Sequence, residues 1–252
     1  MKTDWNSKIE YIPVDYSEFR ATRGSFKKLM RACLPANPAV NTNSGGGDPE
    51  NTFLRGVESS EWLSQLSALM RLSGAIIDLI DVQGSSVLLC LEEGSDVVTQ
   101  VSSIAQLCMD PYYRTLEGFQ TLIEKEWLAF GHRFAHRNNA TGAEGPSSNP
   151  GFAPIFLQFL DIVHQMQKQF PLSFEFNGTY LKFLAYHSVS SRFRTFLADN
   201  ELERVEYGFM AVEDKRGSLP RHYKGVDNGD EDDNIYLCMS AGMSIVQLYV
   251  YS

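Results

Sequence analysis

Apolar residues recur every three or four positions along most of the chain, which is the spacing of helices that bury one face. This spacing predicts helices over five stretches: 19–33, 99–109, 116–130, 154–170 and 179–199. A further helix is predicted after Ser59 and Ser60, either of which can cap it, with its apolar side at Trp62, Leu66, Leu69, Met70 and Ser73. Residues 8–14 (KIEYIPV) predict a short strand.

One short segment has a different pattern. SSVLLC (85–90) is a continuous apolar run, typical of a strand buried on both faces of a sheet. The loop LEEGSDVV (91–98) follows it and leads into the helix over 99–109. We therefore expect an α/β (α+β) fold that is rich in helix and has at least one buried strand.

Two polar stretches divide the chain. Residues 35–51 and 138–151 are rich in Pro, Gly, Asn and Ser, as flexible loops are. The composition predicts an N-terminal strand and helix (1–34), a flexible linker (35–52), a folded core (53–209) and a divergent acidic and apolar tail (210–252). The uncharged residues 235–252 are flanked by acids, so a strand-like or disordered tail is favoured over a membrane anchor.

The net charge of −9 excludes a typical nucleic-acid-binding protein, because such proteins carry a basic patch or stripe. The sequence also lacks a contiguous polybasic run that could hold it on an anionic membrane. Its four cysteines show no zinc-ligand spacing, and residues 1–13 have no apolar core of a signal peptide. We expect a reduced, cytoplasmic protein without a metal or other cofactor.

Two pairs of polar residues are candidates for a site. His132 and His136 are four apart, but zinc needs further ligands and the sequence offers no clear candidate. Glu124 and Glu126 are two apart and so lie on different sides of a helix. They do not fit a general acid/base pair, and we expect a solvated helix face there.

CMDPYYRT (108–115) has the Cys–five residues–Arg–Thr spacing of cysteine-dependent phosphatases. Their thiolate needs a helix N-terminus and backbone N–H groups aimed at it. Cys108 instead ends a predicted helix, and the spacer contains no glycine. We expect Cys108 to be a buried helix cysteine and Arg114 to pair with a carboxylate or cap the helix end.

The strand–loop–helix context of a phosphate site occurs earlier, at residues 85–109. Six residues after Cys90 stands Asp96 rather than arginine, and the loop also carries Glu92 and Glu93. One like-charge contact at ~4 Å costs about 4 kcal/mol near a protein surface. A helix N-terminus returns only about 0.3–1 kcal/mol, so this loop should not hold a phosphate dianion tightly.

The stretch VLLCLEEGSDVVTQVSSIAQLCMDPYYRTLEGFQTLIEKEWLAFGHRF (87–134) resembles the core of the myotubularin-related phosphoinositide phosphatases. The resemblance continues through 154–177 and 180–204. It implies a cysteine-phosphatase-like domain, of which this chain holds a part. It also assigns a degenerate phosphate loop to Leu91, Glu92, Glu93, Gly94, Ser95, Asp96 and Val97.

In that resemblance, Leu91 stands at the place of the nucleophilic cysteine and Val97 at that of the catalytic arginine. Cys90 stands where the family has histidine, so Cys90 and Cys108 are both decoys. An isobutyl group forms no thiophosphate and an isopropyl group binds no phosphate oxygen. The resemblance thus implies a pseudophosphatase with no catalytic residue.

Among inactive branches, LEEGSDVVTQ, FGHRFAHR and YLKFLAYHSVSSRFRTFL are most similar to the SET-binding factors. That similarity implies a parent protein with a DENN module that activates Rab GTPases, and pairing with an active myotubularin relative. Contact with phosphoinositide membranes, endosomal ones included, would be indirect, through parent domains. Two alternatives stay open: an active phosphoinositide 3-phosphatase using Cys90 or Cys108, and a non-catalytic phosphoinositide-binding module.

Overall fold

The computed structural model describes residues 11–34, 49–91, 94–138 and 151–208, and these are folded almost entirely into helices. The α-helices are α1 (Phe19–Cys33), α2 (Pro49–Ser60), α3 (Trp62–Ile77), α4 (Val97–Met109), α5 (Leu116–Leu122), α6 (Phe134–Arg137), α7 (Ile155–Gln169), α8 (Gly178–Val189) and α9 (Glu201–Glu206). Two π-helical segments prolong α3 and α5, at Asp78–Val82 and Ile123–Ala129. Short 3₁₀ turns lie at Pro111–Arg114, Pro171–Ser173 and Arg194–Phe196.

Most predicted helices are confirmed. The helix over 19–33 has the predicted bounds, and α7 agrees with 154–170 within a residue at each end. Helix α5 and the π-helical segment after it cover 116–129. The helix predicted over 179–199 ends at Val189, because the chain turns at Ser191 with a positive φ of 57°.

Two predicted boundaries are wrong. Helix α2 begins at Pro49, so residues 49–52 belong to a helix and not to the linker. Helix α4 begins at Val97, two residues before the predicted start. Residues 35–48, 139–150 and 210–252, which carry the rest of the linker, the second polar loop and the tail, lie outside the described residues. Apart from the end of the linker, the proposed domain boundaries stay predictions.

The predicted sheet is not confirmed. Within the described residues no strand is assigned, neither at 11–14 nor in the segment 85–91. A strand is defined by hydrogen bonds to a neighbouring strand, and no second extended segment pairs with 85–91 in this part of the chain. The structure therefore supports a helix-rich domain, and the α/β class stays a prediction.

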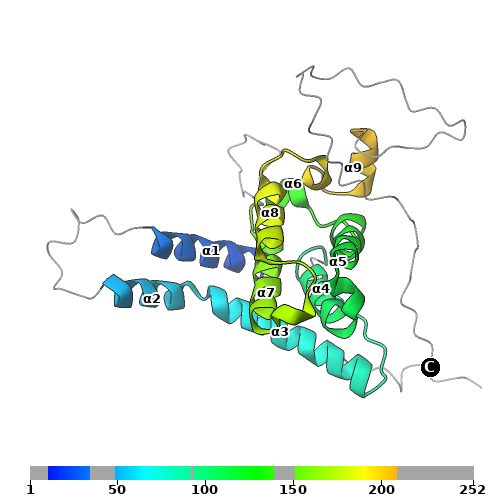
Figure 1. Cartoon of the computed structure of the whole chain (residues 1–252), viewed down its shortest axis with the longest axis horizontal. Helices are drawn as coiled ribbons and strands as arrows, with labels where there is room; N and C mark the ends of the chain where they lie inside the picture. The colour runs from blue at the N-terminus through cyan, green and yellow to red at the C-terminus, as the bar shows by residue number, and fades with distance from the viewer. Residues whose placement is uncertain (1–10, 35–48, 92–93, 139–150, 209–252) are drawn as a thin grey trace, which may run out of the picture.

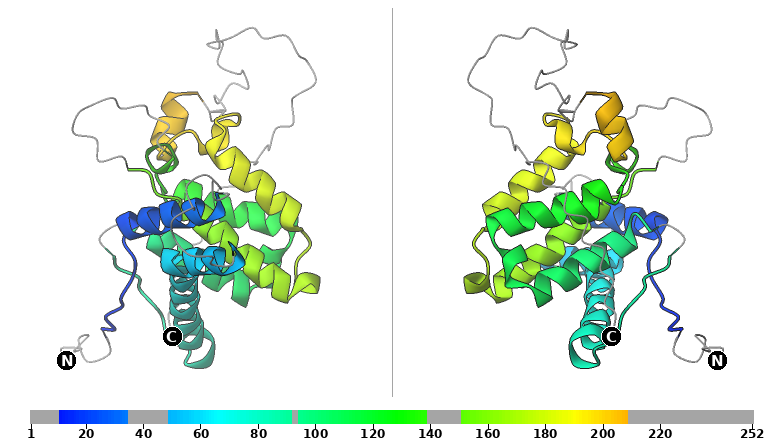
Figure 2. Two further views of the ribbon diagram at one scale, coloured as in Figure 1. Left: turned by 90° about the vertical axis from the view of Figure 1, so that its left-hand side faces the viewer. Right: turned by 90° about the vertical axis from the view of Figure 1, so that its right-hand side faces the viewer.

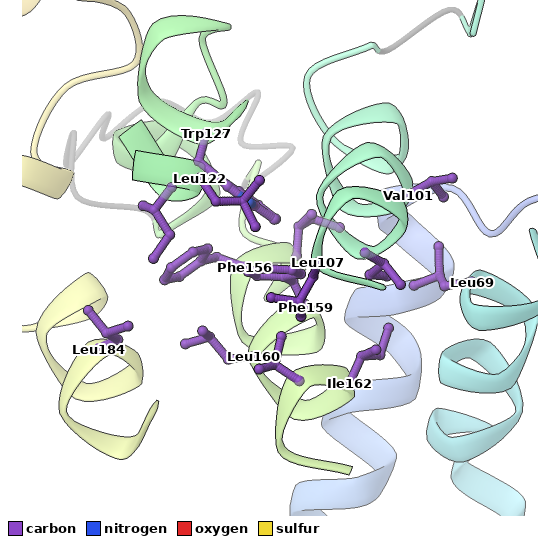
Figure 3. Close-up of a cluster of buried hydrophobic side chains, with 14 of the residues drawn as sticks. Leu69, Val101, Leu107, Leu122, Trp127, Phe156, Phe159, Leu160, Ile162 and Leu184 are labelled. Atoms are coloured by element: carbon purple, nitrogen blue, oxygen red, sulfur yellow. The ribbon is translucent and has the colours of Figure 1, made fainter. Parts of the chain in front are cut away.

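A single hydrophobic core holds the helices together (Figure 3). Helix α4 packs between α3 and α7, and α7 also contacts α8. Trp127 is fully buried, and its ring lies 4.9 Å from Phe156 and 5.0 Å from Phe159. Its indole N–H donates to Ser103 Oγ at 3.0 Å, so the polar edge of the ring is satisfied inside the core.

Helices α1 and α2 lie side by side and project from one side of the helical body (Figure 1). Their backbones approach closely at Gly56, where an added Cβ would lie 2.8 Å from Ala32 Cβ. The base of the pair is fixed to the body by Phe26, whose ring lies 5.7 Å from Trp62. Figure 2 shows the pair again, in two views turned by 90° about the vertical axis.

Candidate functional site

The candidate site begins with the extended segment 85–91. Val87, Leu89 and Leu91 are partly buried and pack against the core, whereas Leu88 is 87% exposed and Cys90 is exposed. Side chains therefore alternate between the core and the surface, as in an extended chain. The expected burial on both faces is not seen, since the outer face carries Leu88 and Cys90.

The loop after this segment ends in a turn formed by Gly94, Ser95 and Asp96, which leads into α4. Glu92 and Glu93 lie outside the described residues. Asp96 occupies the N-cap position of α4, but its side chain accepts no hydrogen bond from the first turn of the helix. The carboxylate is instead engaged elsewhere, although it is only 2% exposed.

Arg137 holds this carboxylate in a two-point contact. Its Nη2 lies 2.5 Å from Asp96 Oδ2 and its Nε lies 3.2 Å from Asp96 Oδ1. The same guanidinium donates to the carbonyl of Gly151 at 3.1 Å and lies 4.3 Å from the ring centre of Phe19. A single arginine from α6 thus joins the loop to α1 and to the chain entering α7.

His132 makes the second contact to the loop. Its Nδ1 lies 2.8 Å from the carbonyl oxygen of Ser95 and 3.3 Å from Asp96 Oδ1. Both neighbours are acceptors, so Nδ1 carries the hydrogen. The imidazole is 1% exposed and packs edge-on against Trp127 and Phe134. His132 is therefore committed to holding the loop.

These contacts set the ionisation of Asp96. Burial alone raises the pKa of this carboxyl, but hydrogen bonds from His132 and Arg137, and their charges, outweigh it and hold the pKa below its usual value. Asp96 is thus a buried carboxylate neutralised by a buried guanidinium. The expected repulsion of phosphate by Asp96 is correspondingly weaker than the sequence indicated, because the sequence did not reveal Arg137 as its partner.

The two positions assigned to catalysis by resemblance carry no reactive group. Leu91 packs against the hydrophobic core, and Val97, the first residue of α4, is itself a core residue that is 5% exposed. The neighbouring Cys90 is exposed at the end of the extended segment. The described part of the loop therefore offers no pairing of a nucleophile with a free cation.

CMDPYYRT lies at the opposite end of α4. The expected burial of Cys108 is wrong, because the residue is exposed in the last turn of α4, with Sγ 3.8 Å from Met166 Sδ. Partial desolvation still raises the pKa of its thiol against the weaker opposing charge of Arg114. Arg114 donates to the carbonyls of Leu107 and Cys108 at 3.2 and 3.1 Å. The predicted capping role of Arg114 is confirmed, and Cys108 lies where a helix disfavours a thiolate.

The expectation for Glu126 was wrong. Its side chain is buried, and its two oxygens accept hydrogen bonds from Ser102 Oγ at 3.0 Å and Gln106 Nε2 at 2.8 Å. The carboxylate pins α4 to the π-helical segment that follows α5. The apolar periodicity of the sequence correctly predicts that Glu126 lies on a helix. It does not reveal that the helix face carrying Glu126 packs against α4.

Arg137 is the site residue that sequence reasoning missed. The sequence feature that could have indicated it is FGHRFAHR (130–137), in which two arginines and two histidines lie around the aromatic Phe134. An arginine inside an apolar context needs a carboxylate partner. Among the described residues, no group of three His, Cys, Asp or Glu side chains is placed to hold a metal ion.

A family model, the myotubularin-like phosphatase domain, matches residues 1–205. Myotubularin-related protein 5 of Caenorhabditis elegans is 44% identical over 206 residues, covering 82% of this chain and 11% of that protein. The mouse phosphatidylinositol-3,5-bisphosphate 3-phosphatase MTMR4 is 39% identical, covering 80% of this chain and 16% of its own length.

The mouse phosphatidylinositol-3-phosphate phosphatase MTMR7 is 35% identical over 214 residues, or 85% of this chain and 30% of the relative. The chain thus spans between about a tenth and a third of the length of these relatives. Because the family match covers most of its residues, the chain belongs to the family with a myotubularin-like phosphatase domain.

Proposed function

We propose that this domain is a catalytically inactive, myotubularin-like pseudophosphatase that acts as a scaffold or regulator of an active phosphoinositide phosphatase. One observation carries the proposal. The positions matched to nucleophile and arginine hold Leu91 and Val97, and both side chains belong to the hydrophobic core or pack against it. Neither side chain can attack phosphorus or bind a phosphate oxygen.

The electrostatics of the loop support the same reading. The guanidinium next to the loop, Arg137, is already paired in two-point contact with Asp96 and is 3% exposed. To bind a phosphate oxygen it would have to leave a buried carboxylate uncompensated, which costs several kcal/mol. Cys90 and Cys108 do not substitute for a nucleophile at Leu91. Cys108 lies at the far end of α4, and Cys90 precedes the loop on an exposed segment.

The proposed scaffold role concerns the longer parent protein to which this domain would belong. The relative at 44% identity is named a myotubularin-related protein, and this chain covers 11% of it. A parent resembling a SET-binding factor would supply a DENN module for a Rab GTPase and pair with an active myotubularin-related phosphatase. Its position would be cytoplasmic and peripheral on endosomal membranes. A pull-down with folded protein that captures no such phosphatase would count against this pairing.

Phosphate release from phosphatidylinositol 3-phosphate tests the inactivity. Folded wild-type protein, Cys90→Ser and Cys108→Ser are assayed beside a phosphatase of this family as positive control. We expect no release above the no-protein blank from any of the three. Release by wild type that is abolished by one cysteine change would overturn the proposal and identify the nucleophile.

One alternative has support of its own. Two relatives at 35–39% identity are named phosphoinositide phosphatases, which favours an active enzyme in the family at large. The same assay decides between the two readings. A non-catalytic phosphoinositide-binding module would instead bind phosphatidylinositol 3-phosphate without releasing phosphate. If the lipid headgroup bound at the surface and not at the buried Arg137, then Arg137→Met would leave this binding unchanged.

A further inference from the structure

Helix α1 concentrates positive charge in an otherwise acidic chain. Its fifteen residues contain five basic side chains, Arg20, Arg23, Lys27, Lys28 and Arg31, and no acidic one. The whole chain has a net charge of −9. The sequence holds no contiguous basic run, because these cations are spread over twelve positions; the helix is what gathers them.

Three of these cations form a stripe on the outer face of α1. Arg20, Lys27 and Arg31 are spaced seven and four residues apart, which places them on one side of a helix. All three are exposed, while Thr22 and Ser25 on the opposite side are buried. Arg20, Lys27 and Arg31 form no ion pair with any other residue that the structure describes.

The free end of the α1–α2 pair is apolar. Met30 and Leu34 at the end of α1 are 46% and 65% exposed. Phe53 and Leu54 in the first part of α2 are 44% and 57% exposed. Figure 1 shows this end as the part of the pair that lies farthest from the helical body.

Close packing between α1 and α2 holds these cationic and apolar side chains in place. Gly56 allows α2 to approach Ala32 closely, and Lys28 Nζ lies 3.5 Å from the carbonyl of Ser59. The base of the pair is tied to the degenerate loop through Phe19, which lies on the guanidinium of Arg137. A cationic face next to exposed apolar side chains is the composition of helices that lie on anionic bilayers.

We propose that the outer face of α1, with the apolar end of the α1–α2 pair, is a docking surface for the anionic headgroup layer of a phospholipid membrane. Charge complementarity selects this occupant: the stripe supplies exposed cations, outside the ion pairs of the described residues, for lipid phosphates and carboxylates. The apolar end supplies side chains for the boundary between headgroups and acyl chains. This goes beyond the proposed function, since it is a direct membrane contact by this domain and not one made through parent domains.

The test is sedimentation of the full chain with vesicles of phosphatidylcholine alone and of phosphatidylcholine with phosphatidylserine. The variant carries Arg20→Gln, Lys27→Gln and Arg31→Gln. A matched control carries Arg71→Gln, Lys168→Gln and Lys182→Gln, which removes the same charge from exposed positions on α3, α7 and α8. Circular dichroism confirms that all proteins are folded.

One cation near an anionic leaflet contributes a factor of about five to partitioning, so the stripe variant should bind anionic vesicles roughly 100-fold more weakly. The control should lose far less, and added salt should weaken wild-type binding. A second variant, Met30→Ser with Leu34→Ser, should also bind more weakly while keeping its salt dependence.

Three results would overturn the proposal. They are equal binding to neutral and anionic vesicles, equal losses in the stripe and control variants, and no vesicle binding by folded wild type. Capture by an acidic polypeptide such as polyglutamate without vesicle binding would assign the stripe to an acidic protein instead. None of these results depends on whether the domain releases phosphate.

Discussion

Replacing the buried carboxylate at the loop, by Asp96→Asn, should destabilise the domain more than any surface charge change. The asparagine keeps the shape but loses the charge, and its amide hydrogens would face the N–H groups of Arg137 at a contact now 2.5 Å long. Arg137 is only 3% exposed, so its charge would stay buried without a counter-ion. Breaking such a pair from one side costs ~3–5 kcal/mol.

That loss is a large fraction of the ~5–15 kcal/mol by which a domain is stable. Urea unfolding followed by circular dichroism measures it, with Asp81→Asn as the control for an exposed carboxylate; the control should change stability by under ~0.5 kcal/mol. Adding Arg137→Met to Asp96→Asn should recover part of the loss, since the stranded charge is then removed. The two changes should therefore be less than additive, with a coupling of about 1–3 kcal/mol.

The pH dependence supplies an independent check. The pKa of Asp96 is depressed in the folded protein, so its contribution is complete above the unfolded pKa of about 3.9 and is lost as pH falls through the folded pKa. The difference between wild type and Asp96→Asn should be constant at neutral pH and shrink only in that acidic window. A loss below ~1 kcal/mol at neutral pH, as for an exposed ion pair, would refute the reasoning.

Two further predictions concern the space around two glycines and the reactivity of one thiol. Gly118→Ala should cost about 1–3 kcal/mol in urea unfolding, because the new Cβ would lie 1.9 Å from the carbonyl oxygen of Tyr112. Gly74→Ala, with nothing within 4 Å, should instead stabilise α3 by about 0.5–1 kcal/mol, and equal effects would contradict this. Iodoacetamide at neutral pH should alkylate Cys108 more slowly in folded than in urea-unfolded protein, as its raised pKa requires; mass spectrometry showing Cys108 as the fastest-reacting thiol would oppose this.

Local sequence patterns predicted the helices well because each helix is specified by neighbours three and four residues away. This holds for α1 and α7, whose bounds agree with their apolar periodicity. Sequence patterns fail to predict a helix boundary where that boundary does not depend on the spacing of apolar residues. The chain leaves the helix after Val189 because Ser191 adopts a left-handed conformation, and α2 begins at Pro49 inside a composition that reads as a loop.

Patterns could not predict what depends on distant parts of the chain. The run 85–90 has the composition of a strand, but a strand needs a partner, and the sequence does not specify one. At the site, Asp96 was recognised as part of the loop, whereas Arg137 lies 41 residues further along and joins it only in the fold. Glu126 shows the same limit, since the helix face it occupies is buried by Ser102 and Gln106 of α4.

The anchoring of the loop explains how this domain can remain folded with leucine and valine at the positions that the resemblance matches to the nucleophile and the arginine. Three interactions place the loop: the Asp96–Arg137 pair, the contact of His132 with the Ser95 carbonyl, and the burial of Val97 at the start of α4. None of them uses a sulfur nucleophile or a phosphate. Leu91 even adds apolar contact to the core at the position matched to that nucleophile. Stability and phosphatase chemistry are therefore separable here. A partner or a membrane that recognises the folded domain needs the first and not the second.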